Sequence, residues 1–210
     1  MRSLADPDSK LFSLLNKLVL MMELNLWVLL CCLPVITAGA AVSSMHAVLL
    51  KIYRDEEKYV TADFFQAMKS NLKNGTVLWI LYLLFLLFLA GIGGAAARLS
   101  PEGSVYVFYG LLIASVIGLL LLDWALILQC RYVYTVPQCL KNAVLAWLKY
   151  PGSTLVYMVS LVIPALFCLT LETLPLLLLG GVALPHMIST TLYSRVFDQM
   201  EGIPLRMPKL

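Results

Sequence analysis

The chain has few charged residues. Only 13% of its 210 residues are Asp, Glu, Lys or Arg, whereas about a quarter of an average soluble domain is charged. The formal net charge of +3 is too small to suggest a nucleic-acid partner, for which a basic stripe or patch is expected. This composition excludes a disordered tail, a disulfide-stapled secreted domain and a soluble enzyme of ordinary surface composition.

The sequence also lacks the motifs that carry chemistry. It contains no catalytic dyad, no phosphate-binding glycine loop and no metal-binding pattern, so we expect no enzyme activity, no cofactor and no metal. The five cysteines form no C-x-x-C pair, and most of them lie in or beside apolar runs. We therefore interpret them as buried, unpaired thiols.

Apolar residues are abundant instead. They make up 61% of the chain, and the mean hydropathy is +0.88. A helix needs about 20 apolar residues to cross a bilayer. Four stretches qualify without a single charged residue: Gly75–Ala97, Ser104–Leu122, Gly152–Leu171 and Leu174–Ser194. A fifth, Leu18–Ile36, carries Glu23 and Asn25. The sequence thus predicts an all-α transmembrane bundle, a single membrane domain over residues 1–210.

The positions of Lys and Arg indicate a sixth crossing. Positive residues are frequent before the first span and again between Lys51 and Lys73, and cytoplasmic segments are rich in positive charge. These two segments can lie on the same side of the membrane only if the chain crosses it twice between them. Thr37–Tyr53 must therefore bring the chain back to the cytoplasmic side. A re-entrant loop there gives the same parity with five spans. In either case both termini are expected in the cytoplasm. A cleaved signal peptide is the other interpretation of the start, but Glu23 and Asn25 interrupt the apolar run.

Two segments are predicted as amphipathic helices on the cytoplasmic side. In residues 60–73, apolar residues recur every four positions from Val60 to Leu72, and Gly75 is expected to end the helix. In residues 136–149, the expected apolar side is formed by Leu140, Val144, Trp147 and Leu148. Each helix either lies in the lipid interface or offers a docking surface to a partner.

A few polar residues lie within the apolar runs, where an ionisable group counts by default as a functional hypothesis. The intramembrane polar candidates are Glu23, Asn25, His46, Asp123 and His186. Glu23 and Asp123 are interpreted as anchors near the cytoplasmic boundary. The two histidines have no second ligand at metal spacing and are interpreted as packing residues. Pro34, Pro164 and Pro185 are expected to kink three spans.

A short motif follows the first span. In Leu33–Ala41, Pro34 is expected to end one helix, Thr37 to cap the next and Gly39 to permit the tight turn between them. Together with Asn25-Leu26-Trp27, His46–Lys51, Asp63-Phe64-Phe65 and Lys69–Lys73, this motif resembles the YesL-like family of bacterial membrane proteins, a family of unknown function. The likeness is distinct over the first third of the chain.

The resemblance implies a plasma-membrane protein of Gram-positive bacteria that works beside a carbohydrate ABC importer. Two functions fit. The first is an accessory subunit that binds the importer's permease subunits, with these interface candidates: Asp55, Glu56, Glu57, Asp63, Phe64, Phe65, Lys69 and Lys73. The second is a small standalone transporter or channel, working as a homo-oligomer, with substrate contacts at Asn25, Glu23, Asp123 and the proline breaks.

Overall fold

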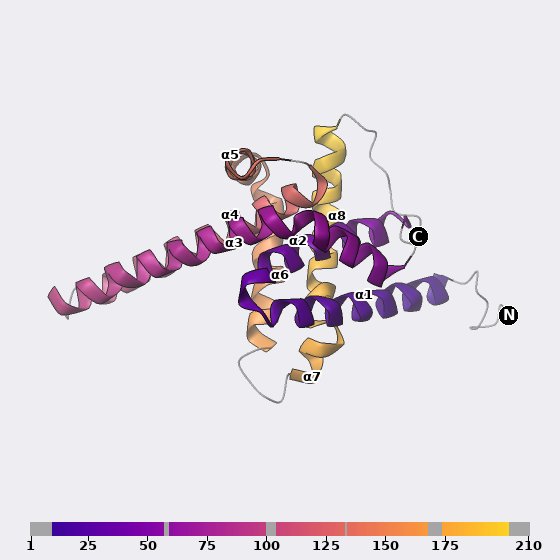
Figure 1. Ribbon diagram of the computed structural model, residues 1–210, viewed down its shortest axis with the longest axis horizontal. Helices are drawn as coiled ribbons and strands as arrows, with labels where there is room; N and C mark the ends of the chain where they lie inside the picture. Colours follow the sequence, from indigo (N-terminus) through magenta and orange to yellow (C-terminus); the bar gives the residue numbers. More distant parts are fainter. Residues whose placement is uncertain (1–9, 57–58, 100–103, 133, 168–173, 202–210) are drawn as a thin grey trace.

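The computed structural model describes residues 10–56, 59–99, 104–132, 134–167 and 174–201, and every regular element in these ranges is helical (Figure 1). The expected all-α class is confirmed. In chain order the elements are α1 (Lys10–Cys32), the 3-10 turn η1 (Val35–Thr37), α2 (Ala38–Tyr53), α3 (Val60–Leu99), α4 (Ser104–Arg131), α5 (Val136–Lys149), α6 (Pro151–Phe167), α7 (Leu174–Leu176), the π-helical segment η3 (Leu177–Gly181) and α8 (Ala183–Met200).

Four segments in the described part of the chain are long and apolar enough to cross a membrane: Leu15–Cys32, Val35–Tyr53, Val60–Leu99 and Val105–Arg131. The second of them is the weakly apolar segment that charge parity required. The expected span Gly152–Leu171 coincides with the shorter apolar helix α6, and its last residues, 168–171, lie outside the described ranges. The expected span Leu174–Ser194 contains the break between η3 and α8.

Helix α2 lies at the centre of the molecule and packs against α1, α3, α4 and α8. Of the Val35–Tyr53 window 67% is buried, against 6% of the corresponding window in Val60–Leu99. The buried residues of α2 include Gly39, Ala40, Ala41, Ser43 and Ser44, whose small side chains let neighbouring backbones come close. This explains why a weakly apolar segment is stable here: most of its surface meets protein.

The closest approach joins α2 to α3 at two glycines. A Cβ atom on Gly39 would collide with the carbonyl oxygen of Gly75 and lie 2.6 Å from Cβ of Trp79, and a Cβ on Gly75 would lie 2.9 Å from Cα of Ala40. The expected turn at Gly39 is therefore wrong. Gly39 lies inside α2, and its lack of a side chain serves the helix crossing.

The rest of the helical-hairpin motif is only partly as expected. Helix α1 ends at Cys32, two residues before Pro34, in agreement with a proline stop. Thr37 precedes α2, but its hydroxyl makes no forward cap. It donates backward, to the carbonyl oxygens of Cys31 (2.7 Å) and Pro34 (2.9 Å), and so stabilises the end of α1 and the η1 turn.

Helix α3 does not end at Gly75, so the separate amphipathic helix expected at residues 60–73 is wrong. Val60 and Phe64, on the predicted apolar side, are buried within the chain, but Leu72 is exposed and Asn71 is buried in its place. At about 100° per residue, position 71 returns to within about 20° of Val60, whereas position 72 is about 120° away. A spacing of four residues drifts off the helical face within three repeats.

Helix α5 has the bounds expected for the second amphipathic segment, and the face that it buries against the chain is not the predicted apolar side. Cys139, Ala143 and Ala146 are buried, while Leu140, Val144 and Leu148 are exposed. Small side chains let α5 lie close on α4, and its large apolar residues then face outward. The start is fixed by Gln138, whose side-chain oxygen accepts the N–H of Thr135 at 3.0 Å.

Gly39→Ala should lower the stability of the bundle by about 1–3 kcal/mol, because the added methyl group has no space between α2 and α3. Thermal unfolding of the purified protein in detergent, followed by tryptophan fluorescence, measures the change. Gly110→Ala is the matched control. A Cβ on Gly110 meets nothing within 4 Å, so that variant should melt at or slightly above the wild-type temperature. Equal melting of both variants would contradict the close crossing.

Candidate functional site

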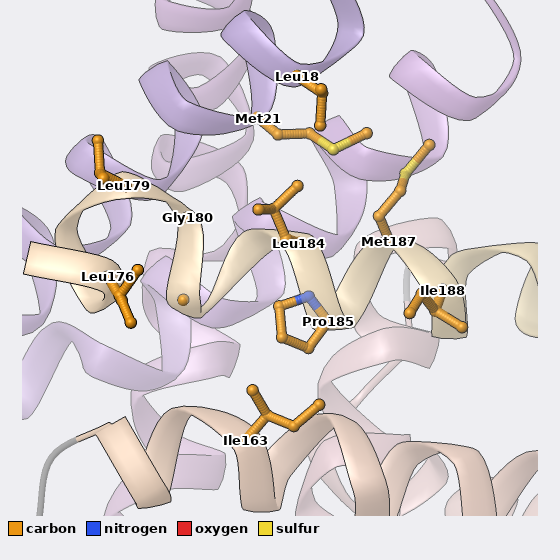
Figure 2. Close-up of a pocket in the computed structure, with 11 residues that line it drawn as sticks. Leu18, Met21, Ile163, Leu176, Leu179, Gly180, Leu184, Pro185, Met187 and Ile188 are labelled. Carbon is orange, nitrogen blue, oxygen red and sulfur yellow. The ribbon is translucent and has the colours of Figure 1, made fainter. Parts of the chain in front are cut away.

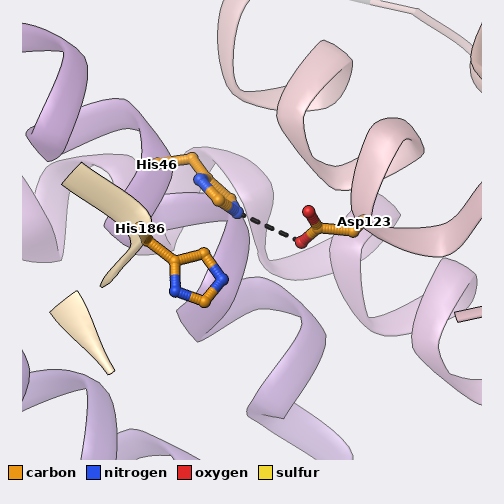
Figure 3. A group of neighbouring side chains, drawn as sticks. All are labelled: His46, Asp123 and His186. Carbon is orange, nitrogen blue, oxygen red and sulfur yellow. Dashed lines mark hydrogen bonds and ion pairs between the residues drawn. The ribbon is translucent and has the colours of Figure 1, made fainter. Parts of the chain in front are cut away.

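Three ionisable side chains converge in the interior from three different helices. His46 is on α2, Asp123 on α4 and His186 on α8, and all three are buried (Figure 3). Each offers a nitrogen or oxygen ligand atom, and these atoms lie within 4.8 Å of one another. Nε2 of His46 is 3.3 Å from Oδ1 of Asp123, and the two imidazole centroids are 5.3 Å apart.

The hydrogen bond of His186 determines which of its nitrogens faces the cluster as an acceptor. Nδ1 lies 2.9 Å from the carbonyl oxygen of Val182. Because a carbonyl oxygen only accepts, Nδ1 carries the proton and donates it, and Nε2 of the neutral ring keeps its lone pair. Nε2 has no hydrogen-bond partner among the described residues. The ring is thus oriented by its own helix, with its acceptor nitrogen unpartnered.

More buried polar atoms in this part of the described structure lack a partner. They are Nδ1 of His46, Oδ2 of Asp123, the hydroxyl of Tyr157 and the hydroxyl of Ser189. The hydroxyl of Tyr193 is satisfied: it donates to the backbone oxygen of His46 at 3.2 Å and lies 2.8 Å from the hydroxyl of Thr190. Buried polar atoms without a partner are rare in native interiors, so this group calls for a bound species or a shared proton.

No local pattern in the sequence indicated this cluster. His46, Asp123 and His186 are 77 and 63 residues apart, and they lie in or beside three different apolar stretches. The interpretation of Asp123 as an interfacial anchor is wrong, because its side chain is 3% exposed and faces His46. The interpretation of the histidines as isolated packing residues does not describe their contact. The useful signal was the presence of three ionisable residues in spans, which must pair with one another inside a bundle.

Asn25 bridges the break between η3 and α8. Its amide nitrogen donates to the carbonyl oxygens of Leu177 (2.8 Å) and Leu178 (2.9 Å), and its oxygen accepts from the N–H groups of Val182 (3.0 Å) and Ala183 (3.1 Å). These are the backbone groups released where η3 meets α8, at Gly180 with φ of 149°. In apolar surroundings such groups need internal partners. Among the described residues, each hydrogen bond of Asn25 goes to this break, which gives the side chain a structural role.

The break is at Gly180 and not at Pro185, where the sequence placed it. Pro185 is in the first turn of α8, where no intrahelical N–H bond is lost. Beside the break is an apolar cavity of about 570 Å³ between α1, α6 and α8 (Figure 2). Leu18, Met21, Ile163 and Leu184 are among the side chains that line it. A cavity of this kind suits an acyl chain or another apolar group.

Glu23 does not reach the buried cluster. It accepts a hydrogen bond from the hydroxyl of Thr61 at 2.5 Å, and the indole N–H of Trp27 donates to the same hydroxyl at 2.9 Å. Glu23 therefore joins α1 to the first turn of α3. This polar contact between neighbouring helices leaves Glu23 outside the group formed by His46, Asp123 and His186.

The surface expected to bind a partner is largely engaged within the chain. Asp55 pairs with Lys17 at 2.8 Å, and Asp63 pairs with Lys51 at 2.5 Å. Phe64 is fully buried, so its inclusion among the interface candidates is wrong. Phe65 is half-exposed and packs edge-on against Trp27, with ring centroids 5.0 Å apart. Lys69 and Lys73 are exposed. Glu56 interacts with another group, and Glu57 lies outside the described residues.

Further ion pairs join the helix ends that bear charge. Arg54, after α2, pairs with Asp198 of α8 at 2.9 Å, with both side chains nearly buried. Arg131, at the end of α4, donates twice to Glu201 at 3.0 and 3.1 Å, and these bonds hold the pKa of Glu201 below its usual range. The C-terminal ends of α2, α4 and α8 are thus gathered on one side of the bundle.

The far halves of α3 and α4 form an apolar hairpin that extends away from the other helices (Figure 1). We refer to residues 84–99 of α3 and 105–113 of α4 as the projecting hairpin. Many of its large apolar side chains are exposed, including Leu84, Leu87, Phe88, Tyr106, Phe108 and Ile113. A Cβ added to Gly91, Gly94 or Gly110 would meet nothing within 4 Å. Within this chain, then, the small residues of the hairpin are mostly without a packing partner.

Asn25→Ala should destabilise the protein by about 1–3 kcal/mol or more, because the backbone groups at the break in the last span lose their partners. The melting temperature in detergent measures the effect, and Asn142→Ala on α5 is the control, with little expected change. A wild-type melting temperature for Asn25→Ala would show that these backbone groups find other partners.

Comparison with known proteins gives one match. Neither the curated proteins nor the solved structures include a match to the chain. Residues 20–91, which contain α2, most of α1 and the first four-fifths of α3, match the model of a family described as a protein of unknown function, DUF624. The YesL-like proteins belong to this family, so the match agrees with the resemblance at the level of DUF624 and covers the same third of the chain.

Proposed function

We propose that the protein is an accessory subunit of a carbohydrate ABC importer, which binds the permease subunits within the membrane and has no catalytic activity of its own. The observation that carries this proposal is the projecting hairpin. A transporter that encloses a path uses its helices to surround that path, whereas only 6% of the span window in α3 is buried within the chain.

The chemistry of the projecting hairpin fits another set of transmembrane helices. Association inside a bilayer depends on close van der Waals packing, and open small residues allow it. Gly91 and Gly94 of α3 and Gly110 of α4 offer such positions between large apolar side chains. This moves the proposed interface from the Asp55–Lys73 segment, where charges pair within the chain, to the hairpin.

The proposal includes the topology of six crossings with both termini in the cytoplasm of a Gram-positive bacterium. The ion pairs support it. Lys17, Arg54, Arg131 and Glu201 belong to the segments that charge parity assigns to the cytoplasm, and the pairs Lys17–Asp55, Arg54–Asp198 and Arg131–Glu201 bring these segments together. The interaction with the importer itself is supported by the family resemblance alone.

A standalone oligomeric transporter is the second candidate, and one observation favours it. The last span is interrupted at Gly180 next to an apolar cavity, and broken helices frame substrate sites in many transporters. Against it, Asn25 already binds the backbone groups at the break, and the described residues that line the cavity offer no charged or hydrogen-bonding side chain to a polar solute.

A photo-crosslinking residue placed at Leu87 should capture a permease subunit in the native membrane, because this side chain of the hairpin is 70% exposed. The same residue at Val19 of α1, which is 60% exposed, is the control and should capture lipid only. Mass spectrometry identifies the captured species. Capture of a second copy of this chain would favour the oligomeric transporter, and lipid at both positions would refute the hairpin as an interface.

Gly94→Leu should reduce the amount of permease that co-purifies with the protein by about tenfold or more, since a large side chain keeps the partner helix away. The melting temperature should not change, because a Cβ at this position touches nothing in the chain. Quantitative mass spectrometry after gentle-detergent purification measures the ratio. Gly152→Leu, an equally open position on α6, is the control, and equal losses in both variants would contradict the assignment.

A further inference from the structure

We infer that His46, Asp123 and His186 form a binding site for a divalent transition-metal ion of the Zn²⁺ type. The three residues come from α2, α4 and α8, so the ion would join three helices at the centre of the bundle. This inference concerns the interior of the protein and does not rest on the proposed accessory function.

The spacing of the ligand atoms supports the site. Zinc bonds to imidazole nitrogen and carboxylate oxygen are about 2.0–2.2 Å long, which places two ligands of a tetrahedral ion about 3.3–3.6 Å apart. His46 Nε2 and Asp123 Oδ1 are already 3.3 Å apart. This distance is long for a strong hydrogen bond. Because the ligand atoms of the group lie within 4.8 Å of one another, side-chain movements of about 1 Å would complete the site.

His186 is prepared as a ligand by its hydrogen bond. Histidines that bind metals usually donate their other ring N–H to a carbonyl or carboxylate, which fixes the ring and its tautomer. His186 does this through Nδ1 to Val182, and its Nε2 lone pair is buried without a partner in the described structure. A packing histidine without a ligand would instead leave this acceptor unsatisfied, which costs about 1–3 kcal/mol.

Charge and ligand type decide which ion fits. An ionised Asp123 is costly in the interior of a membrane bundle unless a cation lies beside it. Two imidazoles with one carboxylate select transition metals, whereas Mg²⁺ and Ca²⁺ prefer an all-oxygen set. Three protein ligands leave a coordination position for water or for another group.

The test is a Co²⁺ titration of the purified full-length protein in detergent, stripped with a chelator and carrying a tag without histidine. His46 and His186 are the sole histidines of the chain, which keeps the background low. We expect visible ligand-field bands that saturate at one Co²⁺ per chain and disappear on addition of Zn²⁺. Absence of these bands in the wild-type protein overturns the inference, whatever the variants do.

Two variants and one control assign the ligands. His186→Asn keeps an amide that can donate to Val182 but removes Nε2, and Asp123→Asn removes the charge at constant shape. Since loss of an outer partner already weakens metal binding by about 10–100-fold, loss of a ligand should weaken it by more than about 100-fold. Glu23→Gln, a polar position of α1 outside the cluster, should bind as the wild type does.

Gel filtration and tryptophan fluorescence select the variants that are folded, and either ligand variant alone is sufficient. Undiminished Co²⁺ bands in a folded His186→Asn or Asp123→Asn protein overturn the site. So does a near-ultraviolet thiolate charge-transfer band that persists in both, because it assigns the binding to the cysteines.

Discussion

Confinement of α2 between α1, α3, α4 and α8 is the constraint on which the rest of the structure depends. A helix with neighbours on most sides must have small residues where backbones cross and internal partners for its polar groups. Gly39 meets the first requirement against Gly75, and Ser43 meets part of the second by donating to the carbonyl oxygen of Leu126 at 3.0 Å. His46 is in the same helix, and its Nδ1 has no hydrogen-bond partner among the described residues. The need for a polar partner is therefore unmet at the centre of the bundle.

Local features of the fold could be predicted from the sequence, because they depend on neighbouring residues. The run of apolar stretches gave the helices, Pro34 marked the end of α1, and charge parity required Thr37–Tyr53 to be a separate helical segment. The features that could not be predicted depend on packing between residues that are far apart in the sequence. The spacing of apolar residues indicated neither that α3 buries Asn71 in place of Leu72 nor that α5 buries its small residues, among them Ala143, against the chain. His46 and His186 are 140 residues apart, and the sequence around neither residue indicates that they are in contact.

The two proposals assign different tasks to different parts of the molecule. The centre holds nearly all the intramembrane polar chemistry, in closely packed helices joined by hydrogen bonds such as Tyr193 to His46. The projecting hairpin has almost no polar chemistry and little packing of its own. In these proposals, the core keeps one arrangement of α2, α4 and α8, and the exposed hairpin is the surface offered to a partner.

The unbroken length of α3 has a mechanical consequence. At about 1.5 Å per residue, the part before Gly75 is about 22 Å long and the part after it about 36 Å. The close contact of Gly75 with Gly39 lies between these two parts, so α3 would pivot there if it tilted. A helix without a hinge transmits a tilt along its whole length. A sideways force on the hairpin therefore becomes a torque at the opposite end, where Thr61 is bonded to Trp27 and Glu23, and where Asp63 is paired with Lys51. α3 is in this sense one rigid element that joins the projecting hairpin to the contacts at the N-terminal end of the helix.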